Sequence, residues 1–106
     1  MQENKQQHCI AENHPSLAGH FPDNPIVPGV LILHHVQQQL LNWLPNIQIK
    51  TLSQAKFLHP LTPNEHFVIL LQQVSATKIK FTCMKESQLL VSGLFIVDAQ
   101  QAGAHV

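Results

Sequence analysis

The sequence of 106 residues contains no arginine and no tyrosine, and charged residues make up only 11% of it. Without the arginine fork, bidentate recognition of phosphates or base edges is disfavoured. All six basic residues are lysines and they form no basic run, which argues against a nucleic-acid-binding face. A surface so poor in charge indicates that a partner subunit covers part of it; the alternative is a surface that is uncharged because it is rich in Gln and Asn.

Cysteine, long apolar runs and metal-ligand spacings are also scarce. Cys9 and Cys83 form no CxxC pair, so we expect free thiols in strands. No apolar stretch is long enough to span a bilayer, and the N-terminal ten residues lack the apolar segment of a signal peptide. These absences predict cytoplasmic residence. The eight histidines include no HExxH and no paired Cys/His spacing, which gives a zinc site little support.

The length fits one domain, residues 1–106. So small a domain buries a modest fraction of its surface and would gain from dimerisation. Residues 13–29 contain four prolines and two glycines, which predicts an irregular, fixed loop. Residues 30–44 predict a helix that begins after Pro28 and ends at Pro45. Its expected buried face rests on apolar residues at helical spacing: Val30, Leu33, Leu40, Leu41 and Leu44.

Most of the remaining sequence is typical of strands. A short strand is expected within residues 4–12, and Gly93 indicates a bulge in the last of the strands that follow the helix. Those strands are predicted at residues 47–60, 66–76, 78–86 and 87–99. One helix must then pack on one antiparallel sheet, which is an α+β layout. Periodicity alone does not distinguish among the folds of this class.

The proline-rich loop carries the most specific motif in the chain. Residues 19–30 read GHFPDNPIVPGV, and an apolar helix start follows them. This stretch resembles the active-site signature of β-hydroxyacyl-[acyl carrier protein] dehydratases, and weaker similarity continues through residues 55–67. The resemblance implies the hotdog fold, in which an antiparallel sheet wraps round one long central helix. The compact length is also similar to the short dehydratases of aryl-polyene synthesis.

The family resemblance implies roles for several residues. His20 would be the catalytic histidine, since an imidazole near neutral pKa suits proton transfer. Gly29 would donate its backbone N–H to the thioester carbonyl, and a helix start favours the negative charge that develops there. Phe21, Pro28 and Val30 are expected to contact the substrate. No metal or organic cofactor is required for this reaction.

The chain departs from the family at the second catalytic group. The family carries a carboxylate on the central helix, four residues after the valine of PGV, and this chain has His34 there. Three explanations stay open. His34 itself acts as the second acid or base, since two imidazoles in different environments can divide the roles. A related hotdog subunit supplies the carboxylate, because family active sites lie at the dimer interface. In the third explanation, the subunit is inactive or catalyses a different reaction.

The resemblance predicts dehydration of a 3-hydroxyacyl thioester to the trans-2-enoyl thioester in a fatty-acid or polyketide-like pathway. The carrier is acyl carrier protein or coenzyme A. Lys56 matches a basic position near the tunnel mouth of relatives, whereas Leu58 and His59 stand where further basic residues are common. The alternatives are a hotdog acyl thioesterase and a non-catalytic or half-site subunit of a heteromeric dehydratase. The partner is accordingly a second copy or another hotdog subunit.

Overall fold

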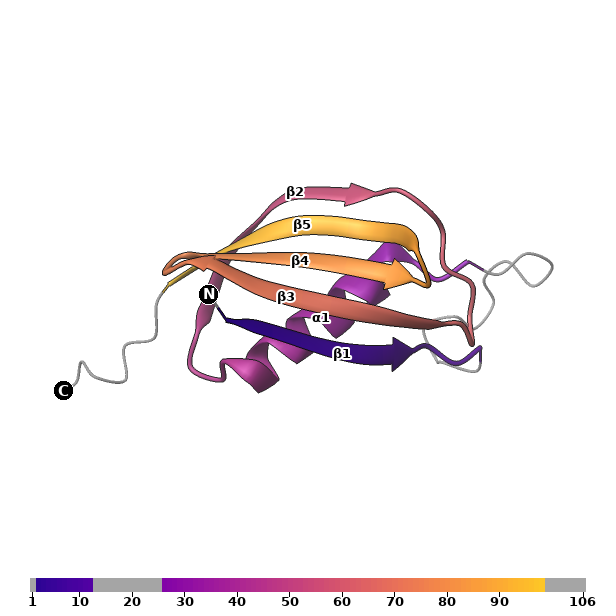
Figure 1. Cartoon of the computed structure of the whole chain (residues 1–106), viewed down its shortest axis with the longest axis horizontal. Coiled ribbons are helices and arrows are strands. Elements are labelled where there is room, and N and C mark those ends of the chain that lie inside the picture. The colour runs from indigo at the N-terminus through magenta and orange to yellow at the C-terminus, as the bar shows by residue number, and fades with distance from the viewer. Residues whose placement is uncertain (1, 13–25, 99–106) are drawn as a thin grey trace.

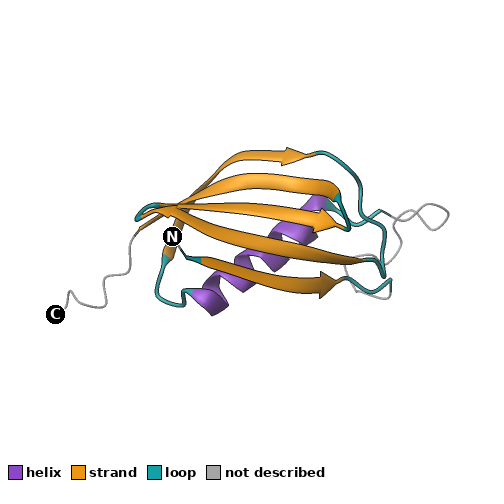
Figure 2. Cartoon of the chain, viewed as in Figure 1, coloured by secondary structure: helices purple, strands orange, loops and turns teal. Residues whose placement is uncertain are grey.

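A single helix crosses one face of a five-stranded antiparallel sheet in the part of the chain that the computed structural model describes, residues 2–12 and 26–98 (Figure 1, Figure 2). The strand order in the sheet is β1-β3-β4-β5-β2. This confirms the predicted α+β layout, and the predicted segments agree to within a few residues. The elements are β1 (Glu3–Cys9), α1 (Gly29–Trp43), β2 (Gln48–Phe57), β3 (His66–Ser75), β4 (Lys78–Lys85) and β5 (Gln88–Asp98).

The core lies between α1 and the three central strands. Alternate residues of β3, β4 and β5 are buried, which is the period of two expected when one face of a sheet is covered. Phe67, Ile69 and Leu71 of β3 are at most 1% exposed within this core. No helix in the described ranges is long and apolar enough to cross a bilayer.

The helix buries one face, whose residues are Ile32, Val36, Gln39 and Leu40. The predicted buried stripe was therefore right for Leu40 and wrong for Val30 and Leu41, which are 71% and 41% exposed. Apolar residues extend round more of the helix than one sheet can cover. The spacing of apolar residues alone does not predict which of them pack against the sheet.

The single buried polar side chain among the described residues is Gln39, which joins α1 to two strands. Its Oε1 accepts a hydrogen bond from Nε2 of His8 at 2.8 Å. Its amide nitrogen donates to Oδ1 of Asn4 at 2.8 Å and to the carbonyl of Ile69 at 3.1 Å. The buried amide thus has hydrogen-bond partners on β1 and β3, as a buried polar group requires.

The same contact determines which tautomers His8 and His35 adopt when both rings are neutral. His8 Nε2 must carry a hydrogen to donate to Gln39, so in the neutral imidazole Nδ1 is an acceptor. Nδ1 of His35 lies 3.0 Å from Nδ1 of His8 and must then be the donor. His35 is therefore held against β1, while the adjacent His34 is exposed, as expected for neighbours about 100° apart on a helix.

The strand β2 is an edge strand, since β5 is its partner within the described sheet. Its register shifts between Ser53 and Lys56, where Gln54 has a φ of 59°. Gly93 of β5 lies across from this shift, so the bulge predicted at Gly93 is located on the facing strand. A Cβ on Gly93 would lie 2.5 Å from Cζ of the buried Phe81, which explains why the position is glycine.

Replacing Gln39 by leucine tests the buried amide. We expect Gln39→Leu to lower the free energy of unfolding by about 1–3 kcal/mol, because His8, Asn4 and Ile69 lose a partner in a site with little access to water. Chemical denaturation measures the change. Gln38→Leu, on the exposed side of the same helix, is the matched control and should change stability by about 0.5 kcal/mol or less. Equal effects of the two substitutions would contradict the assigned role of Gln39.

Candidate active site

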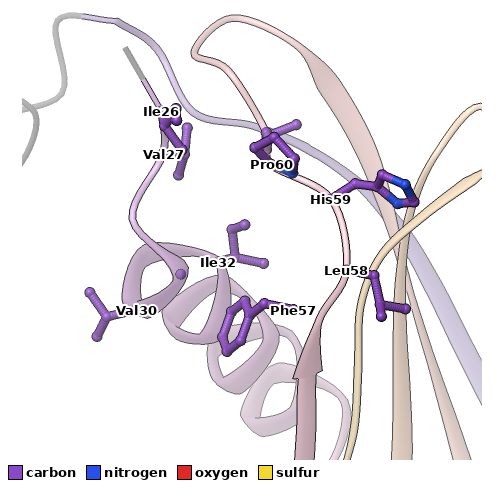
Figure 3. Close-up of a pocket in the computed structure, with 10 residues that line it drawn as sticks. Ile26, Val27, Val30, Ile32, Phe57, Leu58, His59 and Pro60 are labelled. Atoms are coloured by element: carbon purple, nitrogen blue, oxygen red, sulfur yellow. The ribbon is translucent and has the colours of Figure 1, made fainter. Parts of the chain in front are cut away.

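A cavity of about 540 Å³ lies where α1 begins and β2 ends. Figure 3 shows the segment that enters the helix on one side of it, and the end of β2 with the residues that follow on the other. This is a volume suited to a small ligand or to part of an acyl chain. The lining is mostly apolar and consists of Ile26, Val27, Gly29, Val30, Ile32, Phe57, Leu58, His59, Pro60 and Leu61.

Gly29 allows the helix to start against the end of β2. A Cβ at this position would lie 2.4 Å from Cε2 of Phe57 and 2.9 Å from Cζ of the same ring. These separations are too short for any side chain, so close packing of the ring on the helix start requires glycine. Because Phe57 is 53% exposed, its ring has space to move outwards.

The helix presents an uncapped N-terminus to the cavity. Pro28 occupies the N-cap position with φ −58° and ψ 140°, and no side chain caps the first turn. The first turn also holds no acidic residue. The early N–H groups of a helix lack partners within the helix, and the macrodipole adds partial positive charge there. Gly29, the first helical residue, therefore suits an oxygen that becomes negatively charged.

One backbone hydrogen bond sets where this helix end lies. The N–H of Val27 donates to the carbonyl of Leu61 at 2.8 Å, which joins the segment before α1 to the segment after β2. Val27 and Leu61 are 3% and 1% exposed, so this hydrogen bond is shielded from water. The two walls of the cavity are consequently held at a fixed separation.

The described lining holds no evident acid or base for catalysis. Its one ionisable side chain is that of His59. Nδ1 of His59 lies 2.9 Å from the carbonyl oxygen of Leu89 and must carry a hydrogen there, and the ring points away from the cavity (Figure 3). A reaction that needs proton transfer must take its catalytic groups from other residues.

His34 lies close to the cavity along the helix. It is four residues after Val30, so the two side chains share one helix face, one turn apart. Both are exposed. His34 does not line the cavity itself. His34 therefore lies one helical turn from the cavity lining, on a helix face that the sheet of its own chain leaves uncovered.

The other predicted site residues divide into three groups. Gly29 and Val30 line the cavity, whereas Pro28 precedes it without being part of the lining. His20 and Phe21 belong to residues 13–25 and lie outside the described residues. Sequence reasoning missed Phe57, although the family similarity through residues 55–67 was a signal for it. The contact between residues 29 and 57 becomes visible only in the folded chain.

Thiol and metal chemistry find little support in this part of the molecule. Burial raises the pKa of the Cys83 thiol to about 12, so the thiol stays protonated and is a poor nucleophile. Cys9 is exposed on β1, and both cysteines are free thiols in strands, as expected. Across residues 2–12 and 26–98, no three His, Cys, Asp or Glu side chains are grouped to hold a metal ion.

A comparison with protein-family models identifies the chain's family. Residues 1–94 match the model of the ApeI-like family, described as ApeI dehydratase. The chain belongs to this dehydratase family. The match covers the loop motif, the helix and nearly all of the sheet.

Individual relatives agree with the family match. The chain is 33% identical over 97 residues to the 3-hydroxyacyl-[acyl-carrier-protein] dehydratase FabZ of Ehrlichia chaffeensis, and this covers 86% of the chain and 66% of the relative. The corresponding dehydratase of Brucella abortus is 31% identical over 88% of the chain and 64% of its own length. The chain thus spans slightly under two thirds of the length of these curated relatives.

Among solved structures, the chain is similar to the dehydratase heterocomplex ApeI:P from Xenorhabdus doucetiae. The TM-score is 0.81 at 20% identity, over 91% of this chain and 87% of the other. At this identity the likeness shows the fold alone, and it confirms the predicted hotdog fold, with one sheet against one helix.

Alanine substitutions at Gly93 and Gly29 compare how much stability is lost when a Cβ is added at each close contact. We expect Gly93→Ala to lower the free energy of unfolding by about 1–3 kcal/mol, because the new Cβ meets the fully buried ring of Phe81. Gly29→Ala should cost less, since the exposed Phe57 ring can turn away. Thermal unfolding compares the variants, and NMR shifts of the Phe57 ring report its displacement. A larger loss of stability for Gly29→Ala than for Gly93→Ala would contradict this account.

Proposed function

We propose that this protein dehydrates a 3-hydroxyacyl thioester to the trans-2-enoyl thioester, within a fatty-acid or polyketide-like pathway. The observation that carries the proposal is an apolar cavity that reaches an uncapped helix N-terminus at Gly29. An acyl chain suits the apolar lining, and a thioester carbonyl suits the helix end. Membership of a dehydratase family supports the same reaction.

In the proposed reaction, the His20 imidazole removes a proton from C2 of the substrate. Negative charge develops on the thioester oxygen, where the Gly29 N–H stabilises it. The C3–O bond then breaks, a second group protonates the departing hydroxyl, and water leaves as the C2=C3 double bond forms. The chemistry needs a base, an acid and an oxyanion donor, and no oxidant or cofactor. Phe21, Pro28 and Val30 are proposed to contact the substrate near the thioester.

Two sources of the second group are compatible with the structure. His34 is exposed one turn along the helix from Val30, so its imidazole can serve a substrate that extends from the cavity mouth. The same exposure leaves room for a carboxylate from a second subunit to approach the cavity. In either case the group acts on a helix face that the chain's own sheet does not cover.

A second hotdog subunit is the proposed partner on this face. Large apolar residues are exposed on the helix, on the segment before it and along the edge strand β2 with the residues after it: Ile26, Val30, Leu41, Leu52, Phe57 and Leu58. Exposed apolar groups beside an unpaired sheet edge are typical of a surface covered by another protein. The partner is a second copy or a different subunit. The similar Xenorhabdus doucetiae dehydratase is a heterocomplex, which supports the second arrangement.

The proposed substrate carrier is acyl carrier protein, with coenzyme A as the alternative. The curated relatives are 3-hydroxyacyl-[acyl-carrier-protein] dehydratases, which supports the carrier protein. Lys56 on β2 is exposed and can contact an acidic carrier, whereas the neighbouring Leu58 carries no charge. We propose that the reaction takes place in the cytoplasm.

The purified protein, incubated with a 3-hydroxyacyl thioester, should form the enoyl thioester detectable by mass spectrometry. We expect His20→Ala to lower this rate by about a hundredfold or more, the usual contribution of a general acid–base group. Both carriers are tested, and exposed His66→Ala is the matched control. Full activity of His20→Ala would overturn the assignment of His20. Release of the free acid in place of the enoyl product would identify a thioesterase.

The same assay locates the second group. If His34 protonates the leaving hydroxyl, His34→Ala abolishes turnover and His34→Glu, which restores the family residue, retains it. If a partner supplies the carboxylate, the chain alone is inactive and gains activity when a related hotdog subunit is added. Turnover that stays unchanged in His34→Ala, measured on a homodimer, would exclude His34.

A further inference from the structure

The turn between β2 and β3 contacts the chain on both sides of the segment that carries His20. The Val27 N–H donates to the carbonyl of Leu61, and the Asn64 N–H donates to the carbonyl of Ile10, each at 2.8 Å. Residues 10–12 lie just before residues 13–25, and residues 26–27 lie just after them. Both ends of the segment are therefore attached to one short stretch, residues 61–64.

The Asn64 side chain adds two further hydrogen bonds on the N-terminal side. Its Oδ1 accepts the backbone N–H of Glu12 at 3.1 Å, and its Nδ2 donates to Oε1 of Glu12 at 2.9 Å. Asn64 has a φ of 70°, a left-handed conformation that asparagine tolerates better than most residues with a side chain. Glycine would also fit this backbone, but it would make neither side-chain contact.

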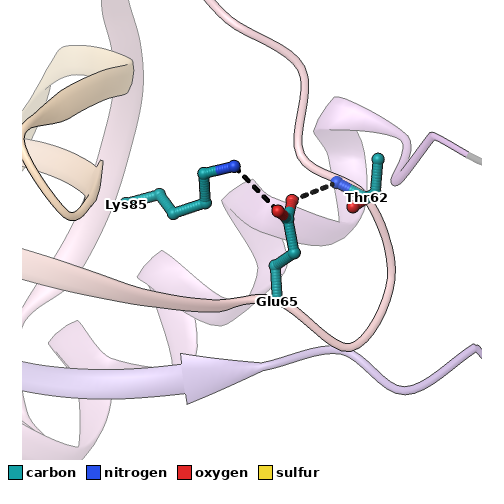
Figure 4. Close-up of polar contacts among 3 residues, drawn as sticks. All are labelled: Thr62, Glu65 and Lys85. Carbon is teal, nitrogen blue, oxygen red and sulfur yellow. Dashed lines mark hydrogen bonds and ion pairs between the residues drawn. The ribbon is translucent and has the colours of Figure 1, made fainter.

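Glu65 connects this turn to the sheet through a hydrogen bond and an ion pair (Figure 4). One carboxylate oxygen accepts the Thr62 N–H at 3.0 Å, and the other lies 2.7 Å from Nζ of Lys85 on β4. The hydrogen bonds from Lys85 and Thr62 lower the pKa of Glu65 to about 2. The carboxylate is thus ionised at neutral pH, and Asn64 extends from a turn that is tied to the sheet.

We propose that Asn64 is a positioning residue for catalysis, because it anchors the start of the segment that carries His20. This inference rests on the proposed function of His20. Closing a segment at both ends limits the positions that residues within it can take. A general base must lie within hydrogen-bond reach of its proton, so a small displacement lowers the rate of the chemical step more than it weakens binding.

The test swaps the donor and the acceptor in the side-chain hydrogen bond between residues 12 and 64. Asn64→Asp keeps an acceptor for the Glu12 N–H and a side chain that tolerates positive φ, but it opposes two carboxylates. We expect kcat to fall by about ten- to a hundredfold, with KM changed by about twofold or less. Glu12→Gln in the Asn64→Asp background places an amide donor opposite the new carboxylate and should restore kcat. Glu12→Gln alone is the control and should stay close to wild type, since its amide can still pair with Asn64.

A second readout requires no activity. Hydrogen–deuterium exchange of the peptide that contains residues 10–12 should become faster in Asn64→Asp and return to the wild-type rate in the double variant. All measurements are made at a temperature at which circular dichroism shows every variant folded. Wild-type exchange in Asn64→Asp, or a loss of kcat that the second substitution does not restore, would overturn the proposal.

The His20→Ala variant separates failure of this inference from failure of the proposed function. If His20→Ala keeps full activity, the proposed function fails and Asn64 has no catalytic base to position. If His20→Ala is inactive while Asn64→Asp has wild-type kcat, the function stands and the role of Asn64 is refuted. If both variants lose activity, and Glu12→Gln restores kcat in the Asn64→Asp background, the proposed function and the role of Asn64 are both supported.

Discussion

The packing of α1 through one face against a single sheet is the constraint on which the rest of the structure depends. Ile32, Val36 and Leu40 recur every fourth residue and are buried against the alternating apolar residues of β3, β4 and β5. Gln39 beside them ties the helix to the edge strand β1. With this face buried, Val30 and His34 on another side of the helix remain exposed. The exposed face is where the proposed chemistry and the proposed partner meet.

The site follows from the place at which this helix begins. Gly29 permits the Phe57 ring to lie against the first turn, and the hydrogen bond from Val27 to Leu61 fixes the approach to that turn. An apolar cavity then ends at backbone N–H groups with partial positive charge. Such a cavity can bind and polarise a thioester, but it needs an acid and a base from elsewhere. In the proposed function, His20 and a second group supply them.

The sequence predicted the fold well because its signals are local. Alternation of apolar residues from residue 66 onwards and the long apolar segment after Pro28 specify the strands and the helix without reference to distant contacts. The motif also predicted Gly29 at the helix start, where the structure places it. The exposure of Val30 and Leu41 was not predictable, because periodicity does not tell whether a sheet or a second subunit covers an apolar residue.

Contacts between distant parts of the chain were beyond sequence reasoning. A break between the strands predicted at residues 47–60 and 66–76 was evident, but the pairing of Asn64 with Glu12, 52 positions away, depends on the folded arrangement of β1 and β3. The contact of Phe57 with the helix start arises in the same way, from the return of β2 along the sheet. In both cases local signals located an element, and the tertiary fold decided what that element contacts.

Hydration of a trans-2-enoyl thioester in D₂O is the decisive test of the proposed dehydratase activity, because a dehydratase also catalyses its reverse reaction. A dehydratase forms a 3-hydroxyacyl thioester that keeps one deuterium at C2 after the reaction is quenched and the product is returned to H₂O, since the acid at the active site delivers a solvent-derived deuteron to that carbon. Mass spectrometry of the product detects it. Cleavage to the free acid and thiol, with no hydroxyacyl thioester formed, would refute dehydratase activity and identify the cavity as the site of a thioester hydrolase.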